Sequence, residues 1–208
     1  MKVLASAAIL ISLNISNWQK LDYSSIPPNE VEQKSNSMLI HVKQSASPLI
    51  YLLEKPVTVT SVHLLGKVDK IINFVDEAQQ GDKKYDDFQM RLGLVVAGDK
   101  KLNALQRTFA AKWVKKLFHI GKERGEGIDH IEFLNLAGQN LPWQSRIHPL
   151  SDLIREKIVG QLSEAGEFEL KHKLKQELKV VALWLSVDGD DTKSSYSVQI
   201  DQIQLNSL

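Results

Sequence analysis

One stretch of the sequence limits the fold more than any other, because residues 57–64 alternate apolar and polar side chains. The stretch reads Val-Thr-Val-Thr-Ser-Val-His-Leu and is rich in β-branched residues. A period of two with this composition predicts a strand that buries one face. Nearer the C-terminus, residues 178–187 are apolar at most positions, which is typical of a central strand covered on both faces. The chain therefore needs a sheet with a substantial core.

Further segments have strand-like patterns. They are residues 38–43, 49–53, 71–75, 88–96, 128–136, 168–170 and 196–205. Pro56 is expected to end the strand at 49–53, because proline cannot donate a hydrogen bond to a neighbouring strand. In the last segment the pair Asp201-Gln202 interrupts the alternation, which predicts a β-bulge.

The pattern changes to a helical period after residue 100. Asn103 and Gln106 have the spacing of a capping box, and Gly121 suits a helix stop. Apolar residues follow at intervals of four between them, namely Leu105, Phe109, Trp113 and Leu117. After a loop bracketed by Pro142 and Pro149, a second amphipathic helix is predicted from its apolar positions, which are Leu150, Leu153, Ile154, Ile158 and Leu162.

The fold class that follows is mainly β. We expect an antiparallel β-sandwich, jelly-roll-like, with two inserted α-helices. The alternative is an α+β domain with both helices on one sheet face. The 208 residues suit one domain of ordinary size, so residues 17–208 are predicted to form a single β-sandwich domain.

The N-terminus resembles a signal peptide. Lys2 supplies a positive charge, and residues 3–13 are apolar or small. A run of this length is too short to span a bilayer but fits the apolar region of a signal peptide. We therefore predict a signal peptide at residues 1–16 and an exported protein, either periplasmic or secreted. Residues 14–16, Asn-Ile-Ser, are a poor cleavage site, and the alternative is a buried first strand or helix.

Composition excludes several classes of function. The chain has 26 basic and 25 acidic residues, a net charge of +1, which argues against a nucleic-acid partner. It has no cysteine, which excludes disulfides, thiolate metal sites, a cysteine nucleophile and a lipid anchor on cysteine. No stretch approaches eighteen consecutive apolar residues, so we do not expect an integral membrane protein.

The acidic segment at residues 188–192 is a candidate metal site. Asp188, Asp190 and Asp191 place three carboxylates within four residues, and calcium prefers several oxygen ligands. Calcium is therefore the one cofactor that the sequence suggests. The alternative is a hairpin connection, where aspartate and glycine favour the turn itself.

Two other groups are candidates for ligand binding. Asp87 and Arg91, beside Asp86, share one face of a strand because their separation is even. They either hold a polar ligand or neutralise each other at a strand entrance. The second group occupies the loop between the two prolines and consists of Trp143, Arg146 and His148. An aromatic ring beside polar groups suits sugar stacking, although Trp143 equally suits one end of the core.

Residues 100–124 are strongly basic and carry one acidic residue, Glu123. On a helical wheel Lys112, Lys115 and Lys116 lie away from the apolar face. They form a candidate partner surface for anionic lipid, acidic glycan or an acidic protein. The alternative is an ordinary solvated helix face.

No catalytic set can be assembled from the sequence. The six histidines are scattered, without H-E-x-x-H or a similar spacing. The chain also lacks G-x-S-x-G and the glycine-rich nucleotide motifs. We therefore predict no catalytic residues.

Several short segments resemble a family of uncharacterised exported bacterial proteins, a β-rich domain of unknown function. The matching segments are Ser45-Ala-Ser47, Asp86-Asp87-Phe-Gln-Met-Arg91, Trp113-Val-Lys and Ala182-Leu-Trp-Leu-Ser-Val-Asp-Gly-Asp-Asp-Thr192. The resemblance implies export and a β-rich fold, and no activity. Members often carry tryptophans in the early strands, where this chain has Leu65-Gly66-Lys67-Val68.

The leading hypothesis is a non-catalytic binding module whose loops contact a saccharide or another envelope component. The first alternative is a periplasmic interaction or structural protein that uses the basic helix. A hydrolase with paired carboxylates comes last. A site would be favoured if Asp86, Asp87 and Arg91 met residues 188–191 in the fold.

Overall fold

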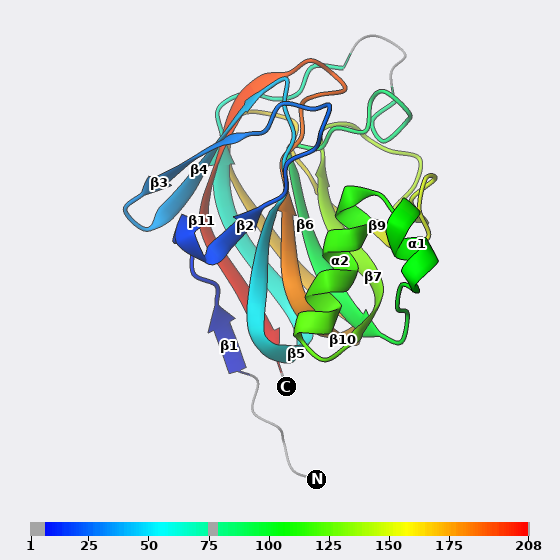
Figure 1. Ribbon diagram of the computed structural model, residues 1–208. Helices are drawn as coiled ribbons and strands as arrows, with labels where there is room; N and C mark the ends of the chain where they lie inside the picture. The colour runs from blue at the N-terminus through cyan, green and yellow to red at the C-terminus, as the bar shows by residue number, and fades with distance from the viewer. Residues whose placement is uncertain (1–6, 75–78, 208) are drawn as a thin grey trace.

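The computed structural model describes residues 7–74 and 79–207. Within these ranges one sheet runs in the order β3-β4-β11-β5-β10-β6-β7-β9-β8, with β1 beside β11 and β2 beside β5 (Figure 1). The strands are β1 (Ala7–Leu10), β2 (Trp18–Lys20), β3 (Glu30–Lys34), β4 (Ser37–Lys43), β5 (Leu49–Val68), β6 (Met90–Gly98), β7 (Gly127–Ala137), β8 (Ser145–Ile147), β9 (Ile154–Gln161), β10 (Gly166–Ser186) and β11 (Ser195–Ser207). The helices are η1 (Ile15–Asn17), α1 (Ala104–Phe109) and α2 (Lys112–Glu123).

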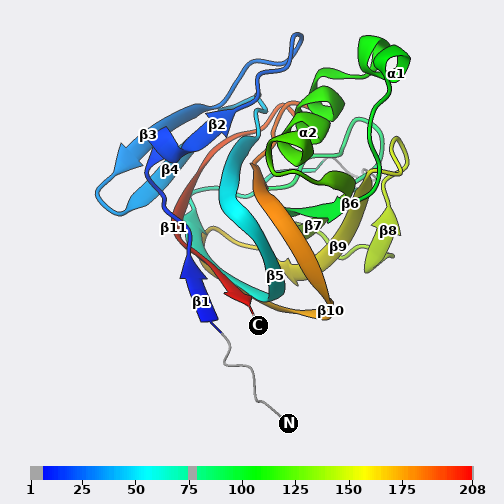
Figure 2. The same cartoon turned by 60° about the horizontal axis from the view of Figure 1, so that its bottom comes forward.

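Two long curved strands, β5 and β10, join the two layers of a sandwich (Figure 2). They pair with each other from residue 49 to residue 68 of β5. The second half of β5 also pairs with β11, whereas the second half of β10 pairs with β6. The predicted mainly β sandwich is therefore confirmed. One pair of strands departs from the predicted antiparallel arrangement, because β7 and β9 are parallel.

The main core lies between the layers. Its fully buried side chains come from both sides, and examples are Met38, Ile40, Ile200, Leu92 and Leu134. A second apolar cluster lies on the opposite face of β6, β7 and β10, where α2 covers it. Its members include Ile50, Val95, Leu117, Ile120 and Trp184. On this face of the sheet, α2 packs on the apolar cluster. Beyond the end of α2 the helix no longer covers the face, which leaves room there for a site.

Most of the predicted strand segments fall on observed strands, several of which are longer than predicted. Pro56 does not end a strand, because the segments at 49–53 and 57–64 both belong to β5. The segments at 168–170 and 178–187 likewise fall on β10, which ends at Ser186 and has a register shift between Lys173 and Leu178. The predicted bulge is confirmed by the register shift between Ile200 and Gln202. Residues 71–74 form no strand, and residue 75 lies outside the described residues.

The first predicted helix is present but broken. The capping box of Asn103 and Gln106 is confirmed, since both reciprocal hydrogen bonds form. Ala110 and Ala111 then adopt extended backbone, which separates α1 from α2. Gly121 does not stop the helix. The helix ends at Glu123, and the left-handed residue beyond its cap is Gly125, with φ of +70°.

The expected apolar stripe of this helix is only partly buried. Leu117 on α2 is fully buried, whereas Leu105 and Phe109 on α1 are 70% and 81% exposed. The break at residues 110–111 turns α1 away from the sheet, so the spacing of four no longer places these side chains on one face.

The second predicted helix is wrong. Residues 150–153 form a turn, and β9 occupies Ile154–Gln161 between β7 and β8. Ile154 and Ile158 are four residues apart, a separation that suits one face of a strand as well as one face of a helix. Pairing with two strands therefore decided the structure.

The predicted signal peptide lies partly outside the described residues. Within the described part, β1 pairs with β11, and Ile11 and Leu13 are buried in the main core. Cleavage after Ser16 would remove that strand and both buried side chains. None of the described helices has the length and apolar composition needed to cross a membrane.

Candidate functional site

A polar row crosses the sheet at the end of the face that α2 covers. Ser186 on β10 is directly opposite Arg91 on β6, and Arg91 is opposite Asn135 on β7. On the next strand Glu156 accepts a hydrogen bond from Asn135 Nδ2 at 3.2 Å. Strand register aligns Ser186, Arg91 and Asn135, and the hydrogen bond from Asn135 adds Glu156. We name this cluster of four polar side chains the polar row.

A cleft of about 340 Å³ opens above the polar row, and we name it the Arg91 cleft. Its polar lining comes from the ends of strands and from loops, and includes Asp86, Asp87, Arg91, His148, Ser186, Asp188, Asp190 and Asp191. Its apolar lining includes Tyr23, Trp113, Ile131, Phe133, Leu150 and Trp184. Residues separated by more than 160 positions in the sequence therefore share one hollow.

Glycine at position 93 shapes one wall of this cleft. Gly93 on β6 is paired with Trp184 on one side and Phe133 on the other. A Cβ atom at Gly93 would lie 2.8 Å from Phe133 Cε1 and 2.7 Å from Ile131 Cγ2. The absence of a side chain lets both apolar groups lean across β6 beside the polar row.

Arg91 is the centre of the ion-pair network and is only 8% exposed. Its Nη2 donates to the Asp86 backbone oxygen at 2.6 Å and to Asp86 Oδ1 at 2.9 Å. Asp188 and Glu156 lie at 3.7 and 3.9 Å from the guanidinium. Burial by itself lowers the pKa of Arg91, but these carboxylates more than offset burial and raise it. The guanidinium therefore stays charged in an enclosed site.

The Pro-bounded loop joins this network. His148 Nε2 lies 3.0 Å from Asp86 Oδ2, and Arg146 Nε donates to Glu156 Oε2 at 2.6 Å. The Trp143 ring lies under the Arg146 guanidinium, 4.0 Å from its centroid. Arg146 and His148 are thus held beside Arg91, whereas Trp143 supports Arg146 from behind and does not line the cleft.

The two acidic segments that the sequence separates by a hundred residues meet here. Asp87 Oδ2 accepts from the Thr192 backbone N–H and from its hydroxyl, each at 2.6 Å. Asp191 Oδ2 accepts from the Asp86 N–H at 3.2 Å. Asp87 therefore fixes the turn at residues 188–192 against the start of β6, and the two acidic candidate segments lie in one site.

Asp188 is poorly compensated within that site. Its Oδ1 accepts from the Ser186 hydroxyl at 2.8 Å. Arg91 Nε, its nearest charged neighbour, is buried and has no hydrogen-bond partner among the described residues. Burial therefore raises the pKa of Asp188 to about 7, with Arg91 lowering it only in part and Asp87 raising it further.

The pKa values of two other carboxyl groups of the cleft are shifted in opposite directions. Burial, Asp87 and Asp191 raise the pKa of Asp190 to about 6. For Asp86 burial also acts upward, but Arg91 and His148 outweigh it and the pKa lies below its usual range. The cleft therefore presents an ionised carboxylate at Asp86, a carboxyl at Asp188 that is partly protonated near neutral pH, and a carboxyl at Asp190 that takes up a proton below about pH 6.

The structure gives no support to the predicted calcium site. In the ranges that the structure describes, no three histidine, aspartate or glutamate side chains are arranged to hold a metal ion. Asp188 lies against Ser186 and Arg91, and Asp191 accepts a hydrogen bond from the Asp86 backbone N–H.

The predicted partner surface lies outside the Arg91 cleft. Lys112 Nζ donates to the Asp22 backbone oxygen at 2.6 Å, and Lys116 Nζ donates to the Gln19 side chain. Lys115 Nζ donates to the Thr108 backbone oxygen at 3.1 Å. These bonds connect α2 to the N-terminal segment and to α1, and only Lys115 lines a cleft.

Several site residues were missed by the sequence analysis. Glu156 was hidden by the wrong helix prediction at 150–162, and nothing in the sequence marks Tyr23. Trp184 and Ser186 carried a usable signal, because they lie at even separations from the selected Asp188 and residues at even separation share one face of a strand. The run at 178–187 was interpreted as covered on both faces, which concealed its polar end.

Comparisons with known proteins add little to this site. No family model and no curated protein matches the sequence. Solved structures that match include a "xylan-binding module CBM15" at 8% identity and a TM-score of 0.40, covering 98% of this chain and 97% of that one. A mutant of a family 29 carbohydrate-binding module matches at 8% identity and a TM-score of 0.38, covering 97% of this chain and 92% of that one. A low-affinity xylan-binding module from Roseburia intestinalis matches at 8% identity and a TM-score of 0.38, covering 99% of this chain and 97% of that one. At such values the likeness supports no argument about this chain.

The raised pKa of Asp188 predicts a pH-dependent stability. A carboxyl whose pKa is higher in the folded protein than in the unfolded chain stabilises the fold at low pH, and loses this effect as pH rises through the folded pKa. Wild type should therefore lose stability relative to Asp188→Asn between about pH 4 and pH 7. The melting temperatures of both proteins across this range test the prediction. A constant difference between them would contradict it.

Proposed function

We propose that the chain is a non-catalytic binding module that holds a saccharide in the Arg91 cleft. One observation carries the proposal, namely that half-buried aromatic side chains stand beside a fixed polar floor. Tyr23 and Trp113 form part of the apolar wall, and Arg91, Asp86 and Asp190 supply the polar groups.

The chemistry of sugars fits such a cleft. A sugar ring presents an apolar C–H face, which packs on aromatic rings, and hydroxyl groups, which donate to carboxylates and accept from guanidinium. The network of Arg91 with Asp86 is held in place before any ligand arrives. A pre-formed polar site loses less conformational entropy on binding.

Export is part of the proposal. The apolar composition of residues 3–13 and the resemblance to exported bacterial proteins support a periplasmic or secreted location, whereas the burial of Ile11 and Leu13 in the core speaks against cleavage after Ser16. N-terminal sequencing of the native protein tests it, and an intact leader on the mature chain would contradict it.

Titration calorimetry against a panel of neutral oligosaccharides tests the binding site. Asp190→Ala should weaken binding of the best ligand by roughly tenfold or more, because loss of one central contact costs over 1 kcal/mol. Asp190 lines the cleft and is half-buried, so the fold should survive its loss. Asp201→Ala, an exposed carboxyl on β11, is the matched control and should bind like wild type.

Two results would overturn this proposal. The first is failure of the wild type to bind any saccharide of the panel, and the second is equal weakening of binding in both variants.

Chromatography of the incubated sugars distinguishes a binding module from a hydrolase. A hydrolase is the second candidate because the pKa values of Asp188 and Asp86 lie on opposite sides of their usual range. Shortened products that disappear with Asp188→Asn would favour it.

A further inference from the structure

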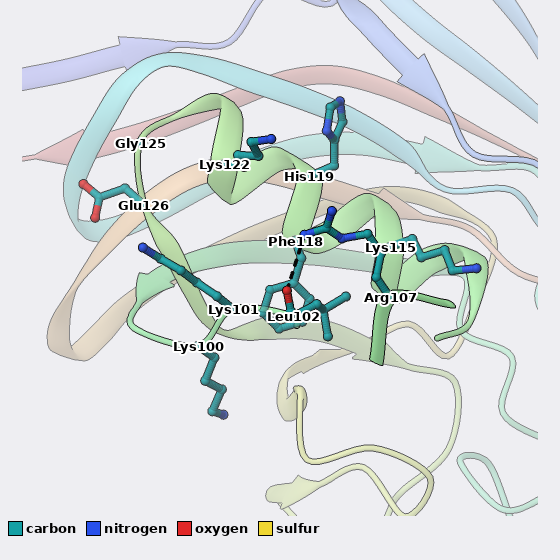
Figure 3. A pocket seen from close by; sticks show the side chains of 10 residues that line it. All are labelled: Lys100, Lys101, Leu102, Arg107, Lys115, Phe118, His119, Lys122, Gly125 and Glu126. Carbon is teal, nitrogen blue, oxygen red and sulfur yellow. Dashed lines mark hydrogen bonds between the residues drawn. The ribbon is translucent and has the colours of Figure 1, made fainter. Parts of the chain in front are cut away.

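A second cleft, of about 600 Å³, lies between the loop at residues 100–102 and the two helices (Figure 3). We name it the basic cleft. Its lining contains five lysine or arginine side chains and a single carboxylate, that of Glu126. The five are Lys100, Lys101, Arg107, Lys115 and Lys122.

The single carboxylate does not neutralise this charge, because Glu126 is already paired with Lys179 outside the lining. Lys100 is held by Asp129, whose backbone oxygen accepts from Lys100 Nζ at 2.9 Å. Among the described residues, neither Lys101 nor Lys122 has an ion pair or hydrogen bond through its side chain. Both are exposed.

Like charges gathered around a hollow raise the local positive potential, and an anion that enters the hollow relieves their repulsion. The charged groups come from separate segments, namely the loop, α1 and α2 (Figure 3). They therefore surround an extended volume and do not converge on one point. Such a distribution fits a ligand with several spaced negative groups better than it fits a lone phosphate.

The base of the basic cleft is apolar. Phe118 and Leu102 are half-buried and line it between the cations, and Figure 3 shows the two side chains together below Arg107. Arg107 Nη2 donates to the Leu102 backbone oxygen at 3.4 Å, which ties α1 to the loop. An aromatic face flanked by cations can contact both the ring and the acidic groups of a charged sugar.

We propose that the basic cleft binds an acidic oligosaccharide, a chain whose sugars carry carboxylate or sulfate groups. This site shares no lining residue with the Arg91 cleft, so the proposal does not depend on the function assigned there. It also differs from the predicted partner surface, of which only Lys115 takes part.

Titration calorimetry with oligogalacturonate at low and high salt tests the proposal, with a neutral oligosaccharide of matched length as reference. Wild type should bind the acidic chain and lose affinity as salt rises. The double variant Lys101→Glu/Lys122→Glu should bind at least tenfold more weakly. Lys173→Glu/Lys175→Glu changes the net charge equally on exposed β10 positions and should bind like wild type.

Four results would overturn the proposal: no binding of the acidic chain, equal loss in both double variants, competition by inorganic sulfate alone at the same affinity, or binding to vesicles of anionic lipid in place of the oligosaccharide. Asp190→Ala serves as an internal check, because it should leave acidic-chain binding unchanged. Failure at one cleft is thereby distinguished from failure at the other.

Discussion

Arg91→Leu should lower the free energy of unfolding by about 3–5 kcal/mol, the usual cost of removing one partner from a buried ion pair. Asp86, Asp188 and Glu156 would lose the guanidinium between them while remaining enclosed. For a chain of this size the melting temperature should fall on the order of 10 °C. Thermal and urea unfolding at neutral pH measure the effect.

The control is Arg155→Leu, which removes an arginine whose side chain is 42% exposed and pairs with Asp129 at 3.6 Å. An exposed pair contributes little, so its loss should change stability by less than about 0.5 kcal/mol. Part of the Arg91→Leu loss should also be recovered at mildly acidic pH, where the abandoned carboxylates become protonated. Similar losses in the two variants would show that Arg91 is not enclosed by the carboxylates as described.

Leu117→Ala should cost about 2–5 kcal/mol, whereas Phe109→Ala should cost less than about 0.5 kcal/mol. The two residues occupied equivalent positions in the apolar stripe read from the sequence. In the fold Leu117 is fully buried against the sheet, and Phe109 is 81% exposed on α1. Urea denaturation of both variants, with circular dichroism to follow the fold, measures the difference.

A large loss of stability in Phe109→Ala would mean that α1 packs against the domain. It would then favour the single continuous helix predicted from the sequence. Leu105→Ala provides a second exposed position on α1 and should behave like Phe109→Ala. The outcome also bears on the basic cleft, because α1 supplies Arg107 to its lining.

Much of the sheet could be predicted from local pattern. The alternation at 57–64 and the apolar run at 178–187 correspond to the strands that join the two layers, β5 and β10. A strand buries alternate side chains, so its pattern survives in sequence. The capping box of Asn103 was predictable for a similar reason, since it involves residues three positions apart.

The secondary-structure predictions were wrong where the local sequence pattern is compatible with two different structures. Ile154 and Ile158 fit a helix and a strand equally, and only pairing with β7 and β8 selected the strand. Pro56 was expected to end a strand, yet β5 continues through it. In both cases the deciding contacts come from residues distant in the sequence, which no local pattern records.

The sequence alone identified many of the polar residues of the Arg91 cleft, because Asp86, Asp87, Arg91, His148, Asp188, Asp190 and Asp191 were all selected as candidates. It did not determine that they belong to one site. That was decided by the tertiary structure, which pairs Arg91 with Ser186 across β6 and β10 and brings Asp87 against the turn at Thr192. The physical reason is that strand pairing is non-local, whereas the polar residues of each strand end are a local property.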